Sequence, residues 1–519
     1  MKKKMKKIIG GILSAVLCVS ALASCGGAND GVQNNANLKN EYTQITASTA
    51  TAKWMDGSDF TPVVRFVAAA DTHLNEKYVV DSDRRVENLF TDAYRYARSQ
   101  EYDKLDAVIF CGDVCERGKE SEYINLRNAW TKNIQPETMF LCLQAGHELI
   151  DGTEELHKQY TGNESLGMHV KINGYHFITI SNQRYDEHGN ATNTVLTEES
   201  NLAWIEEQMA IAYADDNTKP IFTFNHHPVT DTVIASQSQK PVWNEEPVYA
   251  DLFKSYQNNV NFTGHLHTPN NHPRAIMQTE FTTLSCGPVF YSCNTSDIGN
   301  VRLDNIYGDY DSYGAGFLIV EVDEAGRIRI LPYNLADRDF YHETATGQED
   351  KQLIRYIEDV TDKETWLYTE DRWETSDAPY FEEGSKIHDG ISFGYDRYTD
   401  ENGSYQYGMT VKFDFDVASD DDCIEYYQIF IYDKETGEKI NFHSLDIQKK
   451  HVLDDFMFQT SRYYLPQVYE WLPFESNVIE DGDLVVGRTY VIDVEAVDAF
   501  HKYSTNKLTK EFVFEGANG

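Results

Sequence analysis

The stretch VVRFVAAADTH occupies residues 63–73 and joins a largely apolar run, interrupted by Arg65, to a carboxylate and an imidazole. An apolar run of this length is typical of a strand that is buried on both faces. Four more runs of the same kind lie at residues 107–110, 139–143, 220–224 and 260–262. Between the runs, apolar residues recur at helical spacing from Val86 to Ala97 and from Leu202 to Ala212. Strands that alternate with helices predict an α/β domain.

Each of the five predicted strands is followed by side chains that can bind a metal ion. The motifs are D-x-H at 71–73, G-D at 112–113 with E-R-G at 116–118, G-H-E at 146–148, N-H-H-P at 225–228 and G-H-L-H at 264–267. One such motif alone is more often a turn or a surface pair. Five in order, each closing an apolar run, predict one shared site, because the carboxyl ends of neighbouring strands meet at one edge of a sheet. Carboxylate and imidazole ligands suit zinc, manganese or iron.

The order of these motifs resembles that of the calcineurin-like metallophosphoesterases, over about residues 61–340. The pattern of that family is D-x-H, G-D-x-x-D/E, G-N-H-D/E, a later histidine often before x-Pro, and G-H-x-H. The resemblance implies a four-layer αββα sandwich of two mixed sheets. It also implies two divalent metal ions (Mn, Fe or Zn) and hydroxide attack on the phosphorus of a phosphate mono- or diester.

The resemblance implies six protein ligands for the two ions. They are Asp71, His73, Asp113, His226, His265 and His267. One ion would be held by Asp71, His73 and His267. The second would be held by His226 and His265, with Asp113 as a bridge between both ions.

Three further residues are implied to act on the substrate. His147 would steady or protonate the leaving oxygen, and Glu116 would orient His147. Arg117 would meet the phosphate, as the matching arginine does in some branches of the family.

One position departs from the family pattern. The family places an asparagine ligand of the second metal directly before the catalytic histidine, where this chain has Gly146. We therefore expect the second ion to bind more weakly, unless Gln144, Glu148 or a water molecule fills the place. The alternative is a metal-poor, non-catalytic binding lipoprotein on the same scaffold. Glu116 also replaces a tyrosine that purple acid phosphatases need, which argues against that branch.

The N-terminus predicts a lipoprotein signal peptide over residues 1–24. A basic segment at 1–7 precedes an apolar run at 8–24, and L-A-S-C at 22–25 resembles a lipobox with Cys25 as the lipidated residue. An ordinary secretory signal or an uncleaved anchor are the alternatives, since about 17 apolar residues can just span a bilayer. The cysteine directly after L-A-S favours a lipid anchor. We thus expect a secreted chain at the outer face of the bacterial cell membrane.

The remaining sequence predicts the order of the domains. Residues 25–60 are expected to form a flexible tether, and 61–345 the metallophosphoesterase domain, closed by a hairpin at 316–330. Residues 346–375 are expected to be a connector with a short helical pattern around Leu353 to Ile357. Residues 376–519 predict an antiparallel β-sandwich, with strands at 407–415, 427–432 and 489–497. Within it, residues 490–504 are similar to the last strand pair of fibronectin type III modules.

Composition limits the partners. The formal net charge of −39 disfavours nucleic acid as a bulk partner. A small phosphate ester remains compatible, because bound cations reverse the local field. The six cysteines after Cys25 show no zinc-site spacing, and Cys111 and Cys142 are expected to be buried thiols. The sequence leaves open the ester, the oligomeric state and the role of the sandwich.

Overall fold

The structure is a computed structural model of the 519-residue chain. It describes residues 59–75, 79–181, 199–236, 249–290, 315–335, 337–343, 345, 347, 351–399, 405–440, 442–443, 452–453, 456–459, 471–475, 478–479 and 484–517. The predicted signal peptide, Cys25 and nearly all of the predicted tether lie outside the described residues. Within the described part of the chain, no helix is both long and apolar enough to cross a bilayer.

The first of two mixed sheets contains the strand that opens the domain. Its strand order is β12-β11-β10-β1-β2-β3, and β13 pairs with β11. The bounds are β1 Pro62–Ala69, β2 Ala107–Phe110, β3 Met139–Cys142, β10 Gly316–Asp323, β11 Ile328–Asn334, β12 Asp339–Phe340 and β13 Arg355–Ile357. Strands β1, β2 and β3 are parallel, whereas β10 runs antiparallel to β1. The carboxyl ends of β1 and β2 therefore lie at the same edge.

The second sheet has the order β4-β5-β6-β7-β9-β8. Its strands are β4 Gly167–Ile172, β5 Tyr175–Ile180, β6 Ile221–Phe224, β7 Asn259–Thr263, β8 Ile276–Gln278 and β9 Thr282–Ser285. The sequence patterns predict β6 and β7 but not β4, β5, β8 and β9. Strands β5, β6, β7 and β9 are parallel, so the residues after β6 and β7 also share one edge.

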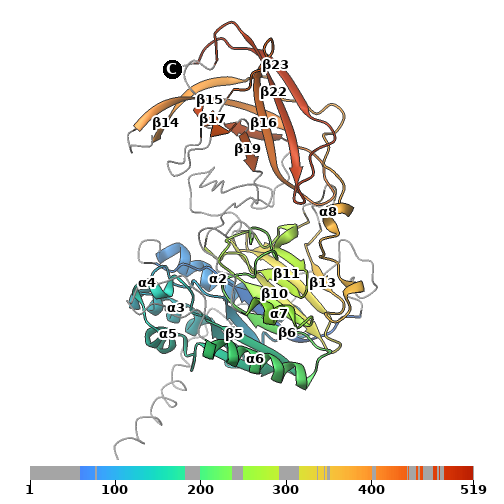
Figure 1. Ribbon diagram of the computed structural model, residues 1–519. Coiled ribbons are helices and arrows are strands. Elements are labelled where there is room, and N and C mark those ends of the chain that lie inside the picture. The colour runs from blue at the N-terminus through green and yellow to red at the C-terminus, as the bar shows by residue number, and fades with distance from the viewer. Residues whose placement is uncertain are drawn as a thin grey trace, which may run out of the picture.

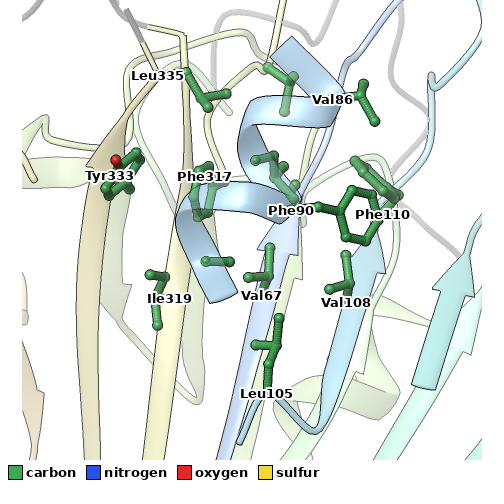
Figure 2. Packing of buried hydrophobic residues seen from close by; sticks show 14 of the residues in the cluster. Val67, Val86, Phe90, Leu105, Val108, Phe110, Phe317, Ile319, Tyr333 and Leu335 are labelled. Atoms are coloured by element: carbon green, nitrogen blue, oxygen red, sulfur yellow. The ribbon is translucent and has the colours of Figure 1, made fainter. Parts of the chain in front are cut away.

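Helices cover the outer faces of both sheets (lower half of Figure 1). Helices α2 (Val79–Ser99), α3 (Glu120–Asn133) and α5 (Glu154–Thr161) pack on the first sheet, and α6 (Glu199–Asp215) and α7 (Ala250–Lys254) on the second. Figure 2 shows Val86 and Phe90 of α2 above Val67 of β1 and its neighbours. These helix residues are spaced by four, so they lie on one face. The predicted αββα sandwich of two mixed sheets is confirmed.

Aromatic side chains join the two sheets. The ring of Phe66 on β1 lies edge-on to rings of the second sheet, with centroid distances of 5.1 Å to Phe222 and 5.6 Å to Phe262. Fully buried aromatic pairs of this kind contribute about 0.5–1.5 kcal/mol beyond the burial of their area. Because this packing fixes one sheet against the other, it brings their ligand-bearing edges together.

The segment predicted as a connector belongs partly to the first sheet. Residues 355–357 form strand β13, buried throughout and paired with Ile328–Ile330 of β11. The helical pattern expected around Leu353 to Ile357 is therefore wrong, because pairing with an open sheet edge overrides a short local preference. Among the described residues of this segment, helical structure lies instead at Lys363–Thr365, a 3₁₀ helix, and at Arg372–Thr375, which is α8. The first sheet thus extends past residue 345.

The C-terminal part is all β, as expected, in the described residues (upper half of Figure 1). One sheet has the order β14-β15-β21-β17-β18 with β20 paired to β15, and the other has the order β19-β16-β22-β23. The strands are β14 Ser392–Thr399, β15 Tyr405–Asp416, β16 Ile424–Asp433, β17 Phe442–His443, β18 Val452–Leu453, β19 Phe456–Gln459, β20 Trp471–Glu475, β21 Val478–Ile479, β22 Thr489–Asp498 and β23 Leu508–Val513. The last strand pair spans 489–513 rather than 490–504. Its similarity to fibronectin type III stays a prediction.

Candidate metal centre

The predicted ligands lie in the loops that follow β1, β2, β6 and β7, and several have an unusual backbone. The φ angles of five of them fall in the left-handed region: Asp71 (55°), His73 (41°), Asp113 (49°), His265 (71°) and His267 (52°). Residues other than glycine rarely adopt this region, and each instance costs roughly 1–3 kcal/mol. Such strain clusters at functional sites, which is an indication independent of residue type.

The first ligand group contains Asp71, His73 and His267, whose ligand atoms lie within 4.8 Å of one another. His73 Nε2 is 3.1 Å from His267 Nε2, and Asp71 Oδ1 is 3.4 Å from the same nitrogen. His73 Nδ1 lies 2.9 Å from Glu116 Oε2. When Nδ1 donates to that carboxylate, Nε2 of the neutral ring presents a lone pair toward its neighbours. A cation among these three groups satisfies all of them.

The second ligand group contains Asp113, His226 and His265. His226 Nδ1 donates to the carbonyl of Cys111 (2.9 Å), so Nε2 of the neutral ring faces Asp113 Oδ2 at 2.9 Å as an acceptor. Two acceptors at this distance require a proton or a metal ion between them. Burial lowers the pKa of His226, but Asp113 and then Asp71 outweigh burial and raise it to about 10. The donor set therefore fits a divalent ion in place of that proton.

Two glycines permit the close approach of these loops. A Cβ on Gly264 would lie 2.6 Å from Ala70 Cβ and 2.8 Å from Asp71 Oδ2. A Cβ on Gly112, whose φ is +94°, would lie 2.5 Å from Ala145 Cβ. Any side chain at either position would push a ligand-bearing loop away, so the glycines of both motifs have a structural reason.

The structure places His147 and Glu116 beside the first ligand group. The ring of His147 lies 4.6 Å from the ring of His73, and its backbone N–H donates to Asp113 Oδ1 (3.0 Å). Its Nδ1 lies 2.7 Å from the backbone carbonyl of Glu116 but 4.0 Å from the Glu116 carboxylate. That carboxylate is closer to His73, so it fixes the ring of a ligand, while the backbone of Glu116 orients His147. Their roles in catalysis stay predictions.

The side chain of Arg117 forms an ion pair on the surface. Its guanidinium donates to both carboxylate oxygens of Asp151, at 2.6 and 3.2 Å, and the Arg117 side chain is 48% exposed. A phosphate contact would have to compete with Asp151. The contact predicted for Arg117 is untested.

Glu148 is one candidate for the metal ligand that Gly146 cannot supply, but its carboxylate has another structural role. Its buried carboxylate accepts hydrogen bonds from the backbone N–H groups of Asp113 (3.2 Å), Cys115 (2.7 Å) and Ala145 (2.7 Å). It thereby ties the Asp113 loop to the loop of Gly146. Burial and the charge of Asp113 raise the pKa of Glu148 to about 7. Its position directly after His147 indicates a residue close to the site, but the sequence does not indicate that its carboxylate holds the backbone of the Asp113 loop.

Sequence reasoning also missed His227, which stands behind the second ligand group. Its ring lies 4.2 Å from the ring of His265, and burial together with His226 lowers its pKa to about 3. A neutral ring at this place supports His265 without adding charge. The backbone carbonyl of His227 accepts a hydrogen bond of 2.6 Å from Asn225, which fixes the loop after β6.

The mixed α/β fold is that of the metallophosphoesterases, and the six candidate ligands converge where the edges of its two sheets meet. Residues 64–269 match the family model of calcineurin-like phosphoesterases, and this range contains all six predicted ligands. The matching solved structures include a purple acid phosphatase, PPD1, isolated from yellow lupin (Lupinus luteus) seeds. The two chains are 13% identical with a TM-score of 0.37, and the match covers 54% of this chain and 52% of the lupin protein, about half of its length. No curated protein sequence matches the chain.

Proposed function

We propose that this chain hydrolyses phosphate mono- or diesters outside the bacterial cell, with two divalent metal ions. The main support is that two ligand groups lie where the edges of the two sheets meet. In each group the Nε2 atom of a histidine faces another atom that can accept a hydrogen bond. The family match over residues 64–269 supports the same class of reaction. The net charge of −39 disfavours nucleic acid and is compatible with a small ester as substrate, and the lipobox-like sequence at Cys25 supports a location at the cell surface.

The residues divide into holding and proton-handling roles. Divalent ions bound by the two groups would act as Lewis acids and lower the pKa of a water molecule. Glu116 holds the ring of His73 so that Nε2 faces the site. His147 uses Nδ1 for the Glu116 carbonyl, which leaves Nε2 for the leaving oxygen. Burial lowers the pKa of His147, but in the metal-free site Asp113 and Glu116 outweigh burial and raise it. We assign His147 to the leaving oxygen from its position beside the first ligand group.

The proposal is tested by measuring the rate of ester hydrolysis as the concentration of a divalent metal ion is raised. Metal-depleted protein should hydrolyse bis(p-nitrophenyl) phosphate or p-nitrophenyl phosphate faster as Mn²⁺ is added into the millimolar range, because Gly146 contributes no ligand. Gly146→Asn should lower the Mn²⁺ concentration for half-maximal rate by about tenfold, the low end of what a supporting group contributes to metal affinity. Gly162→Asn is the matched control: Gly162 caps α5 with a left-handed φ of 79° and has open space around its Cβ position.

The outcomes separate the two readings of the site. If the natural protein already binds two ions tightly, Gln144 or another group supplies the ligand that Gly146 cannot. If neither protein hydrolyses any ester with any divalent ion, the proposed activity is wrong and the binding lipoprotein on a phosphoesterase scaffold is favoured.

The location has its own test. Cys25→Ser should release the chain from the membrane fraction of cells that express it, because the lipid at Cys25 is the proposed anchor. Fractionation followed by immunoblotting measures this. A variant that loses its leader yet stays with the membrane would contradict the lipid anchor.

A further inference from the structure

The loop that carries His265 and His267 contains two of the strained ligands. This metal-site loop comprises residues 264–275, between β7 and β8. Both histidines have left-handed φ angles, 71° and 52°. Such conformations persist only where the surroundings fix the backbone. The groups that hold this loop therefore decide whether both imidazoles stay in place.

Part of the support comes from the domain itself. The side-chain amide of Asn270 donates to the carbonyls of Cys286 (3.1 Å) and Phe317 (3.0 Å), which follow β9 and lie in β10. Asn270 is fully buried. The middle of the loop is thus attached to both sheets.

Arg355 of β13 holds the next part of the loop. Its Nη1 donates to the carbonyl of Asn270 (2.6 Å) and its Nη2 to the carbonyl of His272 (2.7 Å). The planar fork of a guanidinium suits two carbonyls two residues apart. Arg355 is 3% exposed, and burial lowers its pKa to about 10. Because a buried charge is costly without hydrogen-bond partners, the loop carbonyls and Arg355 depend on each other.

Arg372 of α8 holds the end of the loop. Its Nη1 donates to the carbonyl of Pro273 (2.8 Å) and its Nη2 to the carbonyl of Ile276 (2.9 Å). The guanidinium also lies over the ring of Phe500, 5.1 Å from its centroid. Phe500 follows β22, so the same arginine contacts the C-terminal sandwich. Figure 1 shows α8 at the junction of the two parts.

The loop also reaches toward the sandwich through its own arginine. Arg274 Nη2 lies 3.2 Å from Glu425 Oε2 of β16, and both side chains are at most 3% exposed. The guanidinium is 5.7 Å from the ring centroid of Trp373 in α8. A buried, paired contact of this kind fixes orientation, since breaking it leaves an uncompensated charge.

We propose that Arg355, Arg372 and the Arg274–Glu425 pair are positioning residues of the metal centre. They hold the metal-site loop so that His265 and His267 keep their ligand geometry. All four lie beyond residue 269, where the match to the phosphoesterase family ends. The sandwich and the segment before it are then part of the catalytic unit, not a spacer. The inference rests on the proposed function only in requiring that the two histidines bind metal.

The test measures metal binding, not turnover, in the full-length chain. Mn²⁺ affinity is determined by titration calorimetry for the natural protein, Arg355→Lys and Arg372→Lys, which keep the charge but lose the fork, and Arg355→Gln. Each variant should bind Mn²⁺ at least about tenfold more weakly, as the loss of supporting groups does at metal sites. Arg329→Gln is the control. Arg329 is a buried arginine whose guanidinium donates to Glu321. Glu321 is the cross-strand partner of Arg65, and Arg65 lies six residues before Asp71, so this control also perturbs a strand that leads to a ligand. This control should lower the thermal midpoint but keep the affinity.

The results separate this inference from the proposed function. Natural protein that binds no Mn²⁺ overturns the proposed function, and this inference with it. Natural protein that binds Mn²⁺ while the folded arginine variants bind equally well overturns the inference alone. The same holds if Arg329→Gln loses as much affinity as the loop variants. If Arg355→Gln does not fold, the two lysine variants and Glu425→Gln decide the question.

Discussion

The contacts of the His226 side chain indicate that a cation fits beside it. Its Nδ1 is committed to the Cys111 carbonyl, and its Nε2 points at Asp113 from 2.9 Å. If the ring were neutral, the lone pair of its Nε2 would point at a lone pair of the Asp113 carboxylate, and the two would repel each other. In the metal-free site the raised pKa of His226 favours a proton on Nε2, and a bound divalent ion would take the place of that proton. The ligand side chains are thus arranged for a positive charge before any substrate enters.

A second buried histidine, His157 of α5, should make the stability of the protein sensitive to acid, because burial disfavours its charged form. Its Nε2 lies 3.0 Å from the carbonyl of Cys142, and burial lowers its pKa from 6.5 to about 4. The unfolded chain binds this proton first, so stability is present above pH 6.5 and is lost as pH falls toward 4. The two pKa values correspond to about 3 kcal/mol.

Between pH 7 and pH 4, the natural protein should lose about 3 kcal/mol more unfolding free energy than His157→Gln, which cannot titrate. Chemical denaturation at the two pH values measures this difference. Equal losses in both proteins would show that His157 is already protonated, or accessible, in the folded state.

At the scale of elements, the sequence predicts the strands that carry ligands better than the groups that hold them. Apolar runs before D-x-H, G-D and G-H-L-H are local signals, and each corresponds to a strand followed by a buried ligand. Arg355 has no such signal, and the motif that contains Glu148 does not reveal its role. Arg355 donates to carbonyls 83 and 85 residues away, and Glu148 accepts from an amide 35 residues away. The same limit explains the wrong helix at 353–357, because a sheet edge supplied by β11 decides its structure.

An ion cluster that joins three strands of the first sheet gives a prediction at this scale. Glu321 of β10 binds Arg65 of β1 through Oε1 (2.7 Å) and Arg329 of β11 through Oε2 (2.6 Å), and all three side chains are at most 7% exposed. Glu321→Gln leaves two buried guanidinium groups without a carboxylate. We expect a loss of about 3–5 kcal/mol of stability.

Thermal unfolding compares Glu321→Gln with Glu324→Gln, the same change at an exposed turn position three residues on. The midpoint should fall clearly for the first variant and stay near that of the natural protein for the second. Equal midpoints would show that the cluster contributes no net stability.

At the scale of the molecule, the boundary of the matched family and the boundary of the functional unit differ. The match ends at residue 269, two residues after the last predicted ligand. The first sheet nevertheless continues to β13, and the metal-site loop is held from β13, α8 and β16. A second part that looks separate in sequence is therefore built into the support of the first. This dependence is invisible to local patterns, since the contacts join residues more than 80 positions apart.

Substitution of Asp113 is the sharpest test of the two-metal site, because its carboxylate is the predicted bridge between both ions. Its pKa lies well below the ordinary range: burial opposes ionisation, but His226 and other histidines favour the charged form. The measurement is metal content, by elemental analysis after loading with Mn²⁺, together with the rate of hydrolysis of bis(p-nitrophenyl) phosphate, for the natural protein and Asp113→Asn. The natural protein should retain bound Mn²⁺ and show turnover when millimolar Mn²⁺ is present, whereas the variant should lose both the metal and nearly all activity. Normal metal content and turnover in Asp113→Asn would contradict the two-metal site.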